Sequence, residues 1–176
     1  MNTYSFKYQP NIENNDVLVK EKGVCDCCGK TVSVYTKHMY SSNVNFGETK
    51  FCLDCIHSGK AAKKFDGEFV AIYNNKLAPE KIDELIHRTP GYIAWQEDVW
   101  LDCCGDFCQY IKRISSEELL KMPDAEDIIK DYLENNRGIW IEEKTIREEM
   151  SEYGWCNGHL FYCPICKKHH LYVDCD

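Results

Sequence analysis

Two cysteine pairs near the start of the chain constrain its fold more than any other feature. Cys25 and Cys28 form one C-x-x-C pair, and Cys52 and Cys55 form a second, with a stretch rich in Val, Tyr and Phe between the pairs. Two intervening residues let both sulfur atoms of a pair turn toward one point, and four thiolates complete the tetrahedral coordination of Zn²⁺. Such a site is closed and leaves no position for activating water. The sequence therefore predicts a structural zinc site at these four cysteines.

The alternative is a set of disulfides, because the chain has 12 cysteines in 176 residues, as small secreted proteins do. However, the cysteines come as close pairs, and residues 1–7 contain no apolar stretch of the kind found in a signal peptide. We therefore expect a cytoplasmic location, where thiols stay reduced and bind metal. Cys27 is an extra thiol inside the first pair, and the two-residue spacing favours Cys28 as the ligand.

A second zinc site is predicted from more distant cysteines. Cys163 and Cys166 form a third C-x-x-C pair and need two further ligands, which we assign to the C-x-x-x-C pair Cys104 and Cys108. Alternatives within this set stay open. Cys103 could replace Cys104 as a ligand, and either His169 or His170 could replace one of the thiols. The alternatives to metal are buried free thiols or a redox pair at Cys103 and Cys104.

Four cysteines are then left without an assigned role, since free cysteine commonly behaves as a small buried apolar residue. They are Cys27, Cys103, Cys156 and Cys175.

Local patterns predict an α+β fold with small sheets. Strands are expected over residues 4–8, 31–35 and 69–73, a short helix or turn over 56–65, and a C-terminal hairpin over 160–174. Pro79 opens a helix that ends near Arg88, before Thr89-Pro90-Gly91. Ser115 and Glu118 fit a capping box. Further helices follow Asp124 and span about 141–153, with glycines at 138 and 154 as stops.

We expect one compact domain over residues 1–176. It consists of a zinc-ribbon-like part (1–75), a mainly helical part (76–155) and a C-terminal zinc-knuckle hairpin (156–176). The aromatic run Tyr92, Ile93, Trp95 and Trp100 is either core or a partner-binding surface anchored by tryptophan.

The charge of the chain bears on its partners. The net charge is −8 and the pI about 5.3, which argues against a general nucleic-acid binder, because such affinity comes largely from Lys and Arg on phosphates. No apolar run approaches the length of a membrane span. An acidic surface suits a basic protein partner, or solubility alone.

Several motifs, taken together, resemble the CbrC family of bacterial proteins. The matching segments span nearly the whole chain: Phe6-Lys7-Tyr8-Gln9-Pro10, Cys25 to Cys28, Cys52 to Gly59, Lys64-Phe65-Asp66, Arg88 to Tyr92 with Trp95-Gln96, Trp100 to Asp106, and Phe161 to Cys166 with Val173-Asp174. One member of that family is associated with tolerance to a nuclease colicin. The resemblance implies a cytoplasmic protein linked to toxin defence, and it implies no catalytic residues.

Three functions compete on these observations. The first is a zinc-stabilised protein that binds a basic toxin domain through acidic residues and a tryptophan; the candidates are Asp124, Glu126, Asp127, Trp140, Glu142, Glu143, Glu148, Glu149 and Glu152. The second is an enzyme or thiol-redox protein that uses the Cys103, Cys104 and Cys108 cluster, with His38, His57, His87 and Asp106 as further candidates. The third is a nucleic-acid-binding regulator, supported by Lys60, Lys63, Lys64 and Phe65.

Overall fold

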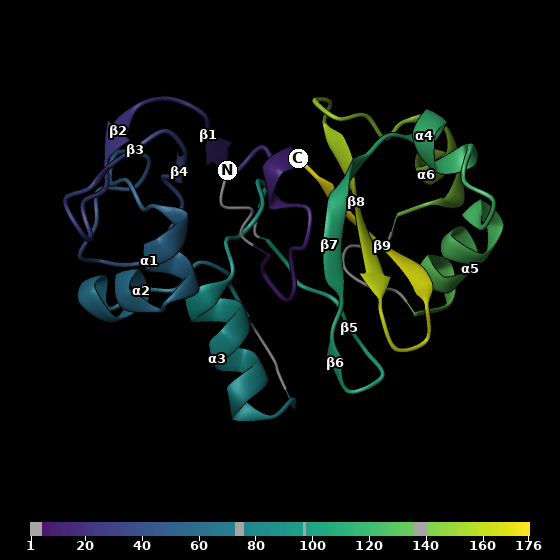
Figure 1. Cartoon of the computed structure of the whole chain (residues 1–176). Helices are drawn as coiled ribbons and strands as arrows, with labels where there is room; N and C mark the ends of the chain where they lie inside the picture. Colours follow the sequence, from purple (N-terminus) through teal and green to yellow (C-terminus); the bar gives the residue numbers. More distant parts are fainter. Residues whose placement is uncertain (1–4, 73–75, 97, 136–140) are drawn as a thin grey trace. The chain divides into compact units, whose positions relative to one another are not determined.

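A computed structural model describes residues 5–72, 76–96, 98–135 and 141–176 of the chain. Its described residues form a mixed α/β structure with small antiparallel sheets and six α-helices (Figure 1). The chain divides into two compact units, Met1–Ile93 with Asp98–Trp100, and Ala94–Glu97 with Leu101–Asp176. This division falls near residue 100, whereas we expected internal boundaries after residues 75 and 155. That the whole chain forms one compact domain stays a prediction.

The first unit has very short strands. Its elements in chain order are the 3-10 helix Ile12–Asn14, β1 Leu18–Val19, β2 Gly23–Val24, β3 Thr31–Val32, β4 Tyr35–Thr36, α1 Leu53–His57, α2 Lys60–Phe65 and α3 Pro79–Arg88. β1 pairs with β4, and β2 pairs with β3. The strand predicted over residues 31–35 is therefore two strands with different partners. The predicted helix from Pro79 to Arg88 is confirmed as α3.

Two predicted strands in this unit are wrong. Phe6 and Tyr8 are buried in the core, yet around them only an isolated bridge joins Phe6 to Gln9. Phe69 and Val70 are likewise buried without strand pairing. In both segments an apolar pattern reports burial, which a loop can satisfy as well as a strand. The outer residues of these predictions, Tyr4 and Tyr73, lie outside the described residues.

The core of the first unit surrounds the cysteines. Phe51 packs edge-on against Phe65 and Phe69, with ring centroids 5.3 and 5.6 Å apart. Cys25, Cys52 and Cys55 belong to the same buried cluster. The predicted ligands therefore lie at the edge of the core, where a metal ion would join the elements that build it.

The second unit is built on a three-stranded antiparallel sheet in the order β7-β8-β9. Its elements are β5 Asp102–Cys103, β6 Asp106–Phe107, β7 Gln109–Ile114, α4 Ser116–Leu120, α5 Ala125–Asn135, α6 Glu143–Glu148, β8 Cys156–Cys163 and β9 Lys168–Cys175. The three helices lie on one side of this sheet and pack on it through residues such as Ile128, Ile129 and Ile146 (Figure 1). The predicted C-terminal hairpin corresponds to β8 and β9, and the capping box of Ser115 and Glu118 is confirmed.

The helix predicted over 141–153 is much shorter. α6 ends at Glu148 because Met150 bonds elsewhere: its N–H donates to Ser116 Oγ, and its carbonyl oxygen accepts from the Ser116 N–H, both at 3.0 Å. Ser116 Oγ also donates to the Ile146 carbonyl at 2.8 Å. Trp140 and Gly138, two residues of the sequence predictions, lie outside the described residues. Among the helices of the described ranges, none is long and apolar enough to span a membrane.

Candidate metal centres

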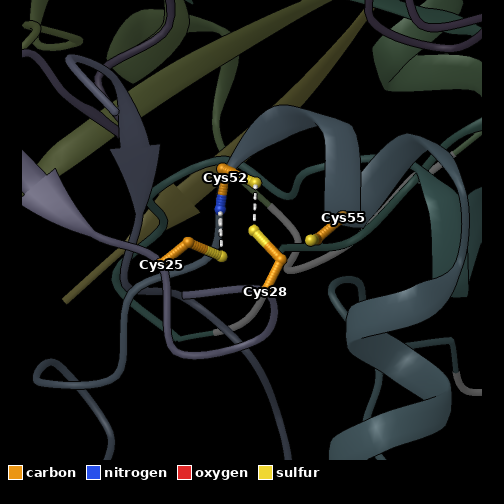
Figure 2. A group of neighbouring side chains, drawn as sticks. All are labelled: Cys25, Cys28, Cys52 and Cys55. Atoms are coloured by element: carbon orange, nitrogen blue, oxygen red, sulfur yellow. Dashed lines mark hydrogen bonds between the residues drawn. The ribbon is translucent and has the colours of Figure 1, made fainter. Parts of the chain in front are cut away.

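The first candidate centre is the predicted group Cys25, Cys28, Cys52 and Cys55. All four Sγ atoms lie within 4.8 Å of one another, and those of Cys28 and Cys52 are 3.8 Å apart (Figure 2). Tetrahedral Zn²⁺ with Zn–S bonds of about 2.3 Å places its sulfur ligands about 3.8 Å apart. The four thiols therefore fit a zinc ion with no large rearrangement.

Local backbone structure brings these thiols together. The Cys25 carbonyl accepts from the Gly29 N–H at 2.7 Å, and the Cys25 N–H donates to the Lys30 carbonyl, which closes a tight turn around Cys28. Gly29 has a positive φ of 73°, a conformation that favours glycine. Cys52 lies at the N-cap of α1 and Cys55 in its first turn, and the Cys52 N–H donates to Cys25 Sγ at 3.3 Å.

Two residues hold the first turn against the rest of the unit. Lys64 of α2 donates through Nζ to the carbonyl oxygens of Asp26 and Cys27, at 2.7 and 2.9 Å. The Asp26 N–H also donates to the Lys50 carbonyl at 2.9 Å, and the Lys50 N–H donates to the Asp26 carboxylate at 2.7 Å. Because Zn²⁺ with four thiolates carries two negative charges, the Lys64 ammonium would also offset charge there.

The surroundings of these thiols shift their pKa values in different directions. The Lys30 backbone N–H, together with the neighbouring thiols, lowers the pKa of the exposed Cys28 thiol to about 7. Burial raises the pKa of Cys52 to about 11, and it also raises that of Cys55. Buried thiolates are costly without a cation, so a metal ion at this position would relieve that cost.

The second candidate centre consists of Cys103, Cys104, Cys163 and Cys166. Their Sγ atoms also lie within 4.8 Å of one another. The Sγ atom of Cys103 is 3.5 Å from that of Cys104 and 3.7 Å from that of Cys166. These separations again match a tetrahedral thiolate site.

Two turns of the second unit present these thiols. β5 and β6 form a hairpin whose two turn residues, Cys104 and Gly105, have positive φ of 54° and 76°, as a type I′ turn requires. Cys163 ends β8, and its carbonyl accepts from the Lys167 N–H at 2.8 Å, which closes the turn that carries Cys166. Cysteine pairs that are far apart in the sequence thus meet at the tips of two hairpins.

Cys108 does not belong to this group, although the spacing predicted it as a ligand. Because the β5–β6 turn occupies only two residues, Cys103 and Cys104 both lie at the tip. Cys108 is buried four residues beyond the tip, where its N–H donates to Leu101 at 2.9 Å. Cys103 takes its place. The histidines considered as substitutes pair with carboxylates instead: Nδ1 of His169 lies 2.7 Å from Asp124, which precedes α5, and that of His170 lies 2.8 Å from Asp131 of α5.

The pKa of Cys163 is set by opposing effects. Burial raises it, but the backbone N–H groups of Cys166 and Ile165, with the neighbouring thiols, outweigh burial and bring it down to about 7. Burial raises the pKa of Cys103. Each centre therefore contains one thiol prepared for ionisation beside others that ionise reluctantly without a cation.

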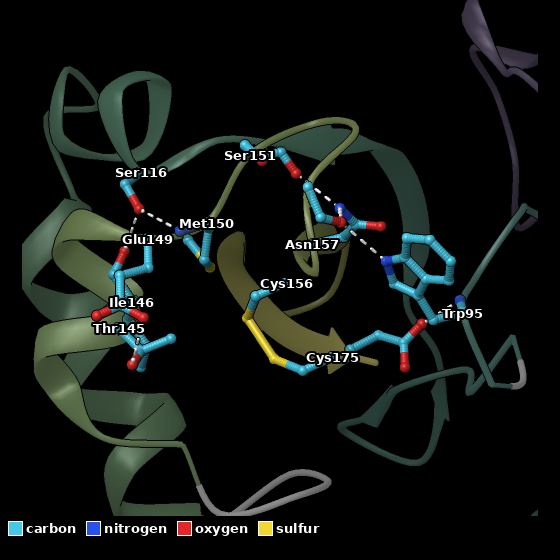
Figure 3. The surroundings of a disulfide bond; sticks show 12 residues. Trp95, Ser116, Thr145, Ile146, Glu149, Met150, Ser151, Cys156, Asn157 and Cys175 are labelled. Atoms are coloured by element: carbon cyan, nitrogen blue, oxygen red, sulfur yellow. Dashed lines mark hydrogen bonds between the residues drawn. A yellow bond between two sulfur atoms is a disulfide. The ribbon is translucent and has the colours of Figure 1, made fainter.

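The sequence interpretation missed a disulfide. Cys156 and Cys175 face each other across β8 and β9 and are bonded (Figure 3). Both had been left without a role, and nothing in their spacing singles them out. The hairpin is thus linked by this bond at its open end and carries two candidate zinc ligands at its turn. A disulfide was not expected for a chain assigned to a reducing compartment.

The three histidines considered as catalytic candidates each contact a different residue. His57 packs on Phe6, with ring centroids 5.7 Å apart, and His87 pairs with Asp83 at 2.8 Å. His38 Nε2 lies 3.7 Å from a buried carboxylate, that of Asp98, whose other oxygen accepts from Tyr40 at 2.8 Å.

Comparison with known proteins identifies the family. A UPF0167 protein of Mycobacterium bovis is 28% identical over 180 residues, which cover 96% of this chain and 91% of that protein. A UPF0167 protein of Pseudomonas aeruginosa is 32% identical over 118 residues, 65% of each chain. No solved structure matches. The CbrC name does not occur in these matches. The family model described as "Uncharacterised protein family (UPF0167)" matches residues 4–175, and the chain therefore belongs to the UPF0167 family.

Proposed function

We propose that both four-cysteine groups bind Zn²⁺ and that the protein is a zinc-stabilised binding protein. The observation that carries this proposal is that each group already supplies four thiols at tetrahedral spacing. Four protein ligands leave no position for water, so the sites suit stabilisation and not hydrolysis. The first zinc would hold a zinc-ribbon-like part, and the second would join the β5–β6 turn to the β8–β9 turn.

We propose a basic protein as the partner, in the cytoplasm. The net charge of −8 favours association with a cationic surface and raises its rate. Nuclease domains are cationic because they hold phosphates. The resemblance to the CbrC family supports a nuclease toxin domain as the specific partner.

The competing functions have weaker support. For nucleic-acid binding, the sequence offers Lys60, Lys63 and Lys64, but Lys64 is engaged with the carbonyl oxygens of Asp26 and Cys27. For thiol-redox activity, the 3.5 Å separation of the Cys103 and Cys104 sulfur atoms is the supporting observation. Adjacent sulfur atoms are equally suited to a shared zinc ion, and Cys108 lies outside that cluster.

Binding to an inactive nuclease tests the proposal. The full zinc-loaded chain would be titrated by calorimetry with a catalytically dead nuclease toxin domain from the same organism, and with lysozyme as an unrelated cationic control. We expect the nuclease to bind at least about a hundredfold more tightly than lysozyme, because specific complexes add several kcal/mol to charge attraction. Removal of zinc should abolish the difference. Equal affinity for the two proteins would remove the basis for a toxin partner.

A further inference from the structure

Three large aromatic side chains of the second unit are exposed around one loop. The exposed fractions are 50% for Trp95, 85% for Tyr153 and 51% for Trp155. The Trp95 indole N–H donates at 3.0 Å to the carbonyl of Gly154, the residue between the other two (Figure 3). The sequence offered core or partner surface for the run from Tyr92 to Trp100. Tyr92 and Trp100 are buried, whereas Trp95 faces solvent.

Trp95 is the anchored member of this aromatic patch, which consists of Trp95, Tyr153 and Trp155. The Trp95 backbone N–H donates to the Asp174 carboxylate, and the Gln96 side chain donates to the Cys175 carbonyl at 3.3 Å. Fixed aromatic side chains lose little conformational entropy when a partner binds.

The loop that carries two of these aromatics is also anchored. Asn157 of β8 donates to the carbonyl oxygens of Ser151 and Gly154, at 2.7 and 3.2 Å. A Cβ atom at Gly154 would lie 2.0 Å from Ser151 Oγ, so a side chain there would require the Ser151 hydroxyl to rotate away. The Asn157 contacts therefore hold the backbone of the loop on which Tyr153 and Trp155 are exposed.

Negative charge borders the patch. Glu152 precedes Tyr153, and Asp176 donates its N–H to the Trp155 carbonyl at 2.8 Å; both side chains are exposed. Within the described ranges, no ion pair involves Glu148, Glu149 or Glu152, whereas Glu126 and Glu143 are paired with Arg147. Arg113 is a nearby cation, and it donates to the Glu152 carbonyl at 2.7 Å.

We propose that the aromatic patch is the docking surface for an arginine- and lysine-rich segment of another protein. Exposed tryptophan and tyrosine faces attract guanidinium groups, and the bordering carboxylates add charge attraction. Nucleic acid and anionic membranes carry phosphates, which Glu152 and Asp176 would repel. A second copy of the chain would bring the same charges together. This inference rests on the proposed binding function and specifies where and how the partner is held.

The test uses the full zinc-loaded chain and a fluorescent arginine-rich peptide, with a glutamate-rich peptide, a single-stranded oligonucleotide and phosphatidylserine vesicles as comparisons. We expect binding of the basic peptide only, weakened at least about tenfold by Tyr153→Ala combined with Trp155→Ala, since central aromatic contacts commonly carry much of the binding energy. Glu152→Gln should weaken it less. The matched control is Phe46→Ala, which removes an aromatic of the first unit that is 69% exposed.

The outcomes separate this inference from the proposed function. Peptide binding that survives the double variant, or that falls equally with Phe46→Ala, would overturn the docking surface, as would preferential binding of vesicles or oligonucleotide. If the nuclease domain binds parent and double variant equally, the binding function stands and the patch is wrong. If the peptide binds through the patch but the nuclease does not bind, the patch stands and the toxin partner is wrong.

Discussion

Lys64 connects α2 to the turn that carries Cys25 and Cys28. Its ammonium donates to two carbonyl oxygens of that turn and lies where a thiolate site would carry negative charge. Lys64→Met removes both effects while keeping most of the side-chain volume. We expect a tenfold to roughly hundredfold weaker affinity for zinc at the first centre, the usual effect of losing an outer contact of a metal site. Competition with a chromophoric chelator measures that affinity.

Lys63→Met is the matched control, because Lys63 is the preceding residue of the same helix and is exposed. It should leave zinc affinity within about twofold, since exposed substitutions away from specific contacts have small effects. Equal losses in both variants would indicate a general charge effect. No loss in Lys64→Met would show that these hydrogen bonds do not support the centre.

His159 of β8 gives the second unit a specific response to acid. It is fully buried, with the Tyr110 and Tyr172 rings at 6.2 and 6.0 Å, and burial together with the Arg113 charge lowers its pKa from 6.5 to about 3. The unfolded chain therefore takes up a proton on this histidine at higher pH than the folded chain does. Its contribution to stability is complete above pH 6.5 and is lost as the pH falls toward 3.

His159→Phe should remove that response. Between pH 6 and pH 4, the parent should lose about 1.4 kcal/mol of unfolding free energy per pH unit more than His159→Phe does. Denaturant titrations of both proteins at each pH measure the difference, and effects of acid on the cysteine groups cancel in the comparison. Parallel pH profiles would contradict the assignment of a neutral buried histidine.

At the scale of elements, Ser116 sets where α6 ends. Its hydroxyl bonds to both Ile146 and Met150, so Ser116→Ala leaves a buried N–H and a buried carbonyl without that partner. We expect a loss of about 1–3 kcal/mol in unfolding free energy. Thr145→Ala on α6 removes only a long contact to Glu149, and it should cost less than about 0.5 kcal/mol. Similar losses in the two variants would mean that α6 does not depend on Ser116.

The disulfide closes the open end of the β8–β9 hairpin. Cys156 and Cys175 are 19 residues apart in the chain, and closing a loop of that length stabilises a fold by about 3 kcal/mol in the chain-entropy account. Cys175→Ser should therefore cost about 3 kcal/mol in oxidised protein and much less after mild reduction of the parent. If parent and variant are equally stable before reduction, the bond contributes nothing to the fold.

The sequence predicts an element well when the residues that determine it are close together in the chain. α3 begins at Pro79 and ends before Pro90 through local signals, and the β8–β9 hairpin surrounds its own C-x-x-C turn. The end of α6 depends on Ser116, thirty residues away along the chain, and no local signal encodes it. The clustered thiols include Cys103 and not Cys108 for a related reason: spacing predicts a knuckle, whereas Cys104 and Gly105 form a two-residue turn.

At the scale of the whole molecule, each of the two compact units contains one candidate centre. The strands of the first unit are two residues long, too short to be stable through pairing alone. Structural zinc contributes about 10–16 kcal/mol to the folding of such units. The sequence predicted seven of the eight clustered cysteines, because the two members of a ligand pair are close together in the chain. For the eighth position it predicted Cys108, whereas the clustered thiol is that of Cys103.

The two zinc centres are tested most directly by counting zinc ions per chain. Native mass spectrometry gives this count for the reduced parent and for Cys28→Ser, Cys103→Ser and Cys108→Ser. We expect two zinc ions in the parent, one in Cys28→Ser, one in Cys103→Ser and two in Cys108→Ser. Two ions in Cys103→Ser with one in Cys108→Ser would contradict the second centre as described. A parent that retains no zinc would contradict both centres.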